Sequence, residues 1–176
     1  VKIIKGAMSY FENIDQVEST WSNIMSECYV NTIFITPQWQ GTWWKRFRSG
    51  TKPIIEVLVS DGKPIGILPL LIEGKKATFI GDSDVYDYMD FPVVEGCGRE
   101  FFSMAWHKLS EMDWDTLNLE SIPENSPTLE YLPEMAMKNG YTVDLHDSDT
   151  TPYMSLPGSW DEYLAGLRKK DRHELR

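Results

Sequence analysis

The chain has 176 residues, of which 41% are hydrophobic and 25% charged, so it can bury a core and is too apolar for a disordered segment. Its formal net charge of −10 is uneven. Residues 168–176 carry five Lys or Arg and two Asp or Glu, which leaves −13 on the rest, and an acidic body disfavours binding to nucleic acid and to anionic membranes.

Cysteine and histidine usage predicts no metal site. The two cysteines, Cys28 and Cys97, form no CxxC pair, and the three histidines are scattered. The opening segment, residues 1–15, is too polar for a signal peptide, and no apolar run approaches the length of a membrane span. We therefore expect a cytoplasmic protein with reduced, unpaired thiols and no membrane span.

The first third of the chain predicts a short strand at residues 1–5 and then two helices. Asp15 is placed to cap the first helix, with Glu18 completing a capping box. The second helix begins at Thr36-Pro37, a capping residue followed by proline at the first helical position. Each helix has an apolar face at helical spacing, formed by Val17, Trp21, Ile24, Met25 and Cys28 in the first and by Trp39, Trp43 and Phe47 in the second.

Strands dominate the middle of the chain. Three β-branched runs predict strands at residues 54–60, 65–72 and 76–80, with turns at Asp61-Gly62 and Glu73-Gly74. A loop rich in Asp and Tyr follows, and Gly96-Cys97-Gly98 introduces a helix. The remaining expected elements are a strand at 115–120, a helix from Ser126-Pro127, strands at 141–145 and 151–156, and a helix over 159–176.

This order predicts a mixed α/β fold. Three consecutive antiparallel strands followed by strand–helix–strand crossovers imply one twisted mixed sheet of about seven strands, with helices on both faces. We place the domain boundary after residue 158, so residues 1–158 form one domain. Residues 159–176 form an amphipathic and then basic helix that leads out of it.

Residues in five parts of the chain carry a family resemblance. Up to residue 91 they are Thr36-Pro37, Trp39, Trp43-Trp44 and Phe47, Gly66 with Pro69-Leu70, and Asp87-Tyr88 with Asp90-Phe91. Near the end they are Leu156-Pro157 before Trp160 and Leu164, and Leu167-Arg168-Lys169-Lys170 with Arg172. The element order is similar to the GNAT (acyl-CoA N-acyltransferase) fold. These residues resemble the N-terminal half of CelD-like acyltransferases, a family associated with cellulose and other polysaccharide synthesis. More distantly, the closing basic helix resembles the end of the first half of FemAB-type aminoacyl transferases.

The resemblance implies a function and a partner. It implies half of an N-acyltransferase that moves an acyl group from a thioester such as acetyl-CoA to an amine of a sugar or cell-envelope precursor. The chain's own C-terminal GNAT-like domain would be its partner and would carry most of the acyl-CoA binding, without a metal. The alternative is a noncatalytic GNAT-like module that holds a small-molecule substrate or a protein partner.

The glycine turn before the third long helix is the candidate cofactor site. In the GNAT fold a glycine-rich turn at this junction binds the cofactor pyrophosphate through backbone N–H groups and the helix dipole. Gly96, Cys97 and Gly98 lie at that position. The family pattern has Gln or Arg where this chain has Val93, and Glu95 opposes phosphate. We therefore expect the isolated chain to bind acetyl-CoA weakly or not at all.

Candidate substrate and catalytic residues lie in several parts of the chain. Aromatic residues beside carboxylates often line a pocket, which marks the loop residues Asp84, Tyr86, Asp87, Tyr88 and Asp90 against the alternative of a solvated loop. Glu120, at the end of a predicted strand, is the candidate general base, and Tyr153 the candidate acid. Other candidate contacts are Trp44, predicted off the main face of its helix, and the basic pair Arg168 and Lys169.

Overall fold

The computed structural model describes residues 7–48, 50–152 and 154–175. Its elements in chain order are β1 (Ala7–Phe11), the short 3-10 helix η1 (Ile14–Gln16), α1 (Glu18–Met25), η2 (Ile33–Ile35), α2 (Pro37–Phe47), β2 (Pro53–Ser60), β3 (Lys63–Glu73), β4 (Lys76–Phe79), α3 (Gly98–Glu111), β5 (Thr116–Asn118), α4 (Pro127–Lys138), α5 (Trp160–Gly166) and α6 (Lys169–Glu174).

The strands form one mixed sheet in the order β1-β2-β3-β4-β5. The pairs β1–β2, β2–β3 and β3–β4 are antiparallel, and β5 lies parallel to β4. Asp61 and Gly62 join β2 to β3 with φ angles of 47° and 78°, the left-handed pair that a tight hairpin requires. The mixed α/β prediction is therefore confirmed. The strand predicted at residues 1–5 lies outside the described residues, and β1 follows it.

The sheet has five strands among the described residues, where the sequence predicted about seven. Residues 141–145 and the described residues of 151–156 are extended but pair with no strand. The apolar alternation of 141–145 favours a strand, but a strand forms only where a neighbouring backbone accepts its hydrogen bonds. The prediction of two further strands here was therefore wrong.

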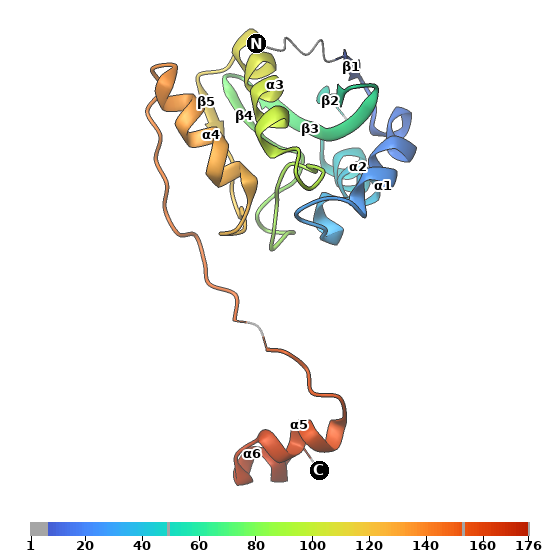
Figure 1. Cartoon of the computed structure of the whole chain (residues 1–176), viewed down its shortest axis with the longest axis vertical. Coiled ribbons are helices and arrows are strands. Elements are labelled where there is room, and N and C mark those ends of the chain that lie inside the picture. Colours follow the sequence, from blue (N-terminus) through green and yellow to red (C-terminus); the bar gives the residue numbers. More distant parts are fainter. Residues whose placement is uncertain (1–6, 49, 153, 176) are drawn as a thin grey trace.

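Helices cover both faces of the sheet (Figure 1). Successive residues of a strand point to opposite faces, so Gly66 and Leu71 of β3 face opposite layers. Gly66 faces α3: a Cβ atom there would lie 2.5 Å from the Phe101 ring, so only glycine allows this approach. α4 packs beside α3, while α1 and α2 pack on the other face.

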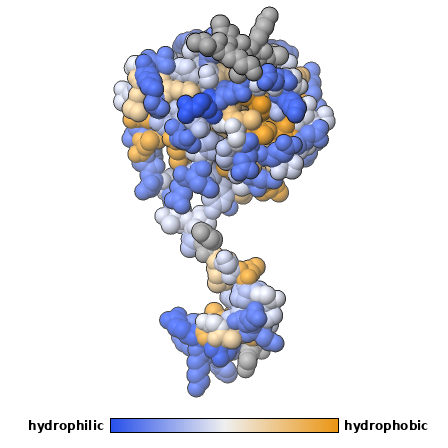
Figure 2. Space-filling model, viewed as in Figure 1, coloured by the Kyte–Doolittle hydropathy of each residue, from blue (hydrophilic) through white to orange (hydrophobic). Residues whose placement is uncertain are grey.

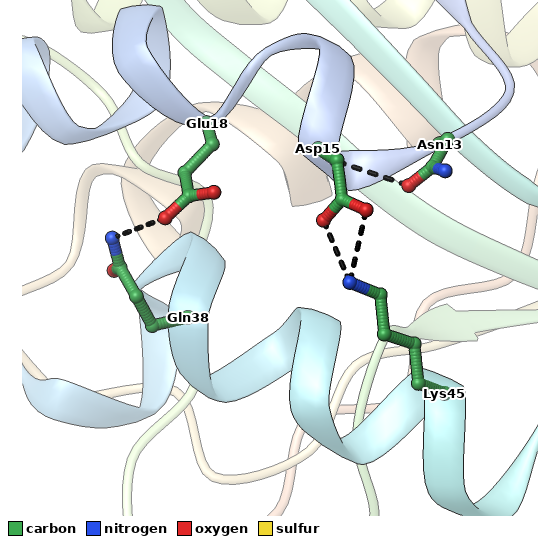
Figure 3. Close-up of polar contacts among 5 residues, drawn as sticks. All are labelled: Asn13, Asp15, Glu18, Gln38 and Lys45. Carbon is green, nitrogen blue, oxygen red and sulfur yellow. Dashed lines mark hydrogen bonds and ion pairs between the residues drawn. The ribbon is translucent and has the colours of Figure 1, made fainter.

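The layer formed by α1 and α2 is held at its surface by polar contacts (Figure 3). Lys45 Nζ on α2 contacts both carboxylate oxygens of Asp15, at 2.8 and 2.9 Å, and Gln38 Nε2 donates to Glu18 Oε1 at 2.9 Å. The predicted capping box was wrong, because Asn13 caps η1 instead and leaves Asp15 and Glu18 to bind α2. Thr36 caps α2 as predicted, by accepting from the Trp39 backbone N–H.

A loop divides the strand that follows β3. Phe79 of β4 pairs with Leu70, but the next pairing with β3 joins Val93 to Gly66. Gly66 precedes Leu70 by four residues along β3, whereas Val93 follows Phe79 by fourteen residues. Ten residues therefore loop out between two stretches of one interrupted strand. The second stretch is bonded to β3 on one side and to the Cys28 segment on the other. This loop is the Asp- and Tyr-rich segment of the sequence.

The chain leaves the body after α4. Gly140, at φ 85°, ends the helix, and Tyr141 lies between Trp106 and Trp114, with ring centroids 5.5 and 5.1 Å away. An extended arm, of which residues 142–152 and 154–158 are described, then leads to α5 and α6, which stand apart from the body as a small helical unit (Figures 1 and 2).

The predicted single helix over 159–176 is two helices. Leu167 and Arg168 are both extended, with ψ near 150°, and break the helix between α5 and α6. The Arg172 guanidinium fastens the two together by donating to the Ala165 and Leu167 carbonyl oxygens, at 3.2 and 2.8 Å. Leu164, on the predicted amphipathic face, is buried.

Candidate functional site

An open cleft of about 390 Å³ lies on one face of the sheet, over β3, β4 and β5. It extends to the carboxyl ends of the parallel strands β4 and β5. The ends of parallel strands meet at one sheet edge, where the loops that follow them converge and ligands commonly bind. The cleft is lined by Trp43 and Arg48 from α2, by Leu71, Glu73, Lys76, Thr78, Asn118 and Glu120 from the sheet and its end, and by Gly81, Asp82, Ser83 and Tyr86 from the loop.

Tyr86 forms the buried wall of this cleft. Its side chain is 8% exposed and lies against Gly81, where a Cβ atom would be 2.7 Å from the Tyr86 ring. Burial, and then the neighbouring carboxylates of Glu120 and Asp82, raise the pKa of Tyr86 to about 12. The phenol therefore keeps its proton at neutral pH, so it can donate a hydrogen bond but cannot act as a base.

Glu120 enters the cleft from the residues that follow β5. Its Oε1 accepts a hydrogen bond from Asn118 Nδ2 at 2.7 Å, and the carboxylate is otherwise exposed. The next residue, Ser121, has φ 59°, a left-handed conformation that is unusual for a residue with a side chain. Its carbonyl oxygen accepts from the Met89 backbone N–H at 3.0 Å, so this turn ties Glu120 to the end of the loop.

The charges in the cleft are only partly paired with one another. Arg48 Nε lies 3.0 Å from Glu73 Oε1, and its guanidinium lies over the Trp43 ring at 5.6 Å. Among the described residues, Asp82, Glu120 and Lys76 form no ion pair. A bound molecule that carries an ammonium group would therefore meet two carboxylates, with Lys76 left to meet an anionic or hydroxyl group of the same molecule.

The other loop candidates lie away from the cleft. The Asp84 backbone N–H donates to Asp82 Oδ1 at 3.1 Å, which forms an Asx turn, and the side chains of Asp84 and Asp87 are exposed. Tyr88 is half-buried and does not line the cleft. Asp90 is fully buried and accepts from the Thr128 hydroxyl at the start of α4. Of the five predicted loop residues, only Tyr86 lines the cleft.

The glycine turn offers no open cradle for a pyrophosphate. The backbone N–H groups of residues 95, 96 and 97 all donate within the chain, so they are not available to phosphate oxygens. Their acceptors are the Glu27 carbonyl oxygen at 2.7 Å, the Tyr29 hydroxyl at 2.9 Å and the Val94 carbonyl oxygen at 3.0 Å. The N–H groups of the turn itself are therefore engaged, while the first-turn N–H groups of α3 receive no side-chain cap from the described residues.

The glycines of this turn serve the packing of the chain. Gly96 adopts φ 82°, which a residue with a Cβ atom rarely adopts. Gly98, the first residue of α3, is buried, and a Cβ atom there would lie 2.9 Å from the Tyr131 ring. Burial, and then Glu100 and Glu27, raise the pKa of the Cys97 thiol, so it is a poor nucleophile. Both cysteines are free thiols.

Comparison with known proteins yields distant structural similarity alone. No protein-family model and no curated protein sequence matches the chain. Among solved structures, the chain is similar to glucosamine-6-phosphate N-acetyltransferase from Arabidopsis thaliana, with a TM-score of 0.42 and 15% sequence identity, over 88% of this chain and 99% of that one. Similarity at this level assigns neither a family nor a reaction.

Residues 7–48, 50–152 and 154–175 include neither a membrane-spanning helix nor a metal-binding cluster of side chains. No helix there is long and apolar enough to cross a bilayer. No group of three or more His, Cys, Asp or Glu side chains within those residues is placed to hold a metal ion.

Trp44, Arg168 and Lys169 do not line the cleft. Trp44 packs against the core, and its indole N–H donates to the Thr51 carbonyl oxygen at 3.3 Å. Tyr153 lies outside the described residues. Arg168 pairs with Asp171 at 2.9 Å on the separate α5–α6 unit, which also carries Lys169.

The sequence interpretation missed the cleft residues that come from regular strands. Glu73 and Lys76 are directly opposite each other across the β3–β4 ladder, on the face that Arg48 approaches. The turn at Glu73-Gly74 was predicted, and a hairpin turn fixes which flanking residues are partners. That signal was sufficient to place Glu73 beside Lys76, but nothing in the sequence placed Arg48 above them.

Proposed function

We propose that the cleft at the ends of β4 and β5 binds the amine of a small polar molecule, and that the chain supplies this acceptor site to an N-acyltransferase of the GNAT-like type. The observation that supports it is the convergence of Glu120, Asp82 and the protonated Tyr86 in one cleft. An ammonium group is attracted by the two carboxylates, and Tyr86 offers a hydrogen bond to an oxygen of the same molecule.

The chemistry that this chain provides is binding and proton acceptance. Glu120, exposed and held by Asn118, is placed to accept a proton from the bound ammonium, directly or through a water molecule. That transfer leaves a neutral amine, the form in which an amine is nucleophilic. The N–H groups of the glycine turn are engaged within the chain, so we propose that another domain binds the acyl donor and that Arg168 and Lys169 on the α5–α6 unit lie at the join.

A second candidate is a noncatalytic binding module. The engaged N–H groups of residues 95–97 favour it, because they are not free to bind a pyrophosphate as the resemblance implies. Both candidates share the amine-binding cleft. They differ in whether a continuous partner domain completes an acyl-transfer site, with sugar or cell-envelope amines as the proposed acceptor class.

The test uses a hydrophilic amine and its neutral analogue. We expect glucosamine to bind this chain in isothermal titration calorimetry and glucose to bind at least about tenfold more weakly, because a hydrogen bond between charged groups contributes on the order of 2 kcal/mol. Glu120→Gln and Asp82→Asn should each weaken glucosamine binding by a similar factor. Glu124→Gln, which removes an exposed carboxylate outside the cleft, should leave it unchanged.

Acetyl-CoA decides between the two candidates. The isolated chain should show no micromolar binding and no turnover with glucosamine. Acetyl transfer by a longer natural protein that contains this chain, lost in Glu120→Gln, would support the acyltransferase role. Binding of glucosamine without any turnover in that longer protein would support the noncatalytic module. Equal affinity for glucose and glucosamine would refute the amine cleft itself.

A further inference from the structure

A second cleft, of about 330 Å³, lies on the opposite face of the sheet, under the carboxyl end of α3. It is lined by Tyr10 of β1, Ile54 and Glu56 of β2, and Lys108, Glu111 and Met112 at the end of α3. It shares no lining residue with the first cleft.

Glu56 is the feature that needs explanation. It lies in the middle of β2, pairs with Tyr10 on one side and Leu68 on the other, and is 5% exposed. A buried carboxylate is costly unless it is paired and hydrogen-bonded. Among the described residues Glu56 accepts no side-chain hydrogen bond, and its nearest cation, Lys108 Nζ, lies 4.0 Å away, beyond hydrogen-bond distance.

Lys108 is shared between two carboxylates. Its ammonium group lies 3.4 Å from Glu111 Oε2, closer than to Glu56. Two carboxylates therefore face one cation, and the cleft also receives the negative end of the α3 dipole, which favours positive charge. Burial raises the pKa of Glu56, against the lowering effect of Lys108, which agrees with a carboxylate that lacks a sufficient counter-charge.

The walls of the cleft are apolar around this carboxylate. Ile54, Met112 and the ring of Tyr10 leave room for a short hydrocarbon, and the Tyr10 side chain is half exposed at the rim. A ligand that fits has one cationic group at the carboxylate end and an apolar stem along these walls.

We infer that this second cleft is a binding site for a primary alkylammonium group, with Glu56 as its main counter-ion and Ile54 and Met112 as the wall for its stem. The site is separate from the acceptor cleft and does not depend on the proposed function. Glu111 adds attraction at the rim. Lys108 opposes the ligand, because it competes with the ammonium group for the same carboxylates.

The test uses hexylammonium chloride as the probe, with 1-hexanol as its neutral analogue, at about pH 8, well above the ordinary pKa of a carboxyl group. Binding is followed by chemical-shift changes of backbone amides in β1, β2 and the end of α3. We expect hexylammonium to bind at least about tenfold more tightly than hexanol, as a charged hydrogen bond implies. Glu56→Gln should remove that preference.

Two further variants keep the test decisive if Glu56→Gln fails to fold. Lys108→Gln should tighten hexylammonium binding by about threefold or more, since it removes the competing cation, and Glu111→Gln should weaken it. Glu124→Gln, which removes an exposed carboxylate that lines neither cleft, should leave the affinity for this probe unchanged. Equal binding of hexanol, tighter binding of hexyl sulfate, or weaker ammonium binding in Lys108→Gln would each overturn the inference.

Discussion

Asp90 is a buried carboxylate that joins the looped-out segment to α4. Its Oδ1 accepts from the Thr128 hydroxyl and from the Phe91 backbone N–H, the latter at 2.8 Å. Its Oδ2 is buried and has no hydrogen-bond partner among the described residues. Burial raises the pKa of Asp90, so the charged form is disfavoured in the folded chain relative to the unfolded one.

The first prediction concerns Asp90→Ala and Asp90→Asn. Alanine leaves two buried donors without an acceptor, so we expect it to lower the free energy of unfolding by about 1–3 kcal/mol at neutral pH. Asparagine keeps an acceptor at Oδ1 and should cost less. Urea unfolding of both variants measures the difference, and an Asp90→Ala variant as stable as the wild type would contradict it.

The difference in stability between the wild type and Asp90→Asn should depend on pH with a definite sign. Because the folded-state pKa is raised, the wild-type carboxyl contributes stability at pH values below its unfolded pKa and loses that contribution as the pH rises through the folded pKa. Asparagine does not titrate. The stability of the wild type relative to Asp90→Asn should therefore fall as the pH rises above the unfolded pKa of about 4, and a constant difference would count against a raised pKa.

Which individual side chains line the cleft was harder to predict from the sequence than the elements that carry them. Glu120 was predicted from its position at a strand end and Tyr86 from the pairing of aromatic and acidic residues, and both line the cleft. Asp84 and Asp87 share the same sequence context but are exposed, because loop backbone geometry decides which side chains turn inward. Arg48 was missed because its place depends on the packing of α2 over the sheet.

At the level of elements, the contact between α3 and β3 depends on Gly66. A Cβ atom there would lie 2.5 Å from the Phe101 ring and 2.6 Å from the Pro92 carbonyl oxygen, which accepts a bond from Ile67. The ring can shift but the backbone oxygen is held in the ladder. We expect Gly66→Ala to lower the free energy of unfolding by about 3 kcal/mol.

Gly50→Ala is the matched control for this prediction. Among the described residues other than its chain neighbours, no atom lies within 4 Å of a Cβ atom built at Gly50, so the substitution should change the free energy of unfolding by less than about 0.5 kcal/mol. Thermal and urea unfolding of both variants compare them directly. Similar losses in the two would show that the approach of α3 to β3 is not the cause.

Helices were predicted better than strand pairing. Thr36-Pro37 and Ser126-Pro127 start α2 and α4 as predicted, because capping and proline effects act within one turn. Residues 141–145 carry a clear strand pattern and still form no strand, because a strand depends on a partner that local sequence does not specify.

For the whole molecule, the structure predicts a stable body that ends just after Tyr141. A chain truncated after Val143 keeps Tyr141 between Trp106 and Trp114 and loses only the arm and the α5–α6 unit. Its melting temperature should equal that of the full chain within about 2 °C. Truncation after Asn139 removes the aromatic contacts, worth about 1 kcal/mol each, and should lower the melting temperature by several degrees.

Differential scanning calorimetry of the two truncations checks this expectation. If both lose stability equally, the arm or the α5–α6 unit supports the body in a way that the described contacts do not include. If neither does, the contacts of Tyr141 contribute little.

The interrupted strand after β3 has a consequence for how this domain can change over evolutionary time. In an ordinary ladder, inserting one residue turns every later side chain to the opposite face. Here the second stretch is held by its own bonds to Ile65 and Ile67 and to the Cys28 segment, so its register does not depend on the number of residues between Phe79 and Pro92. Lengthening a loop adds only a small entropic cost. The loop that lines the cleft at the ends of β4 and β5 can therefore gain or lose residues during evolution while the pairing of the sheet is unchanged.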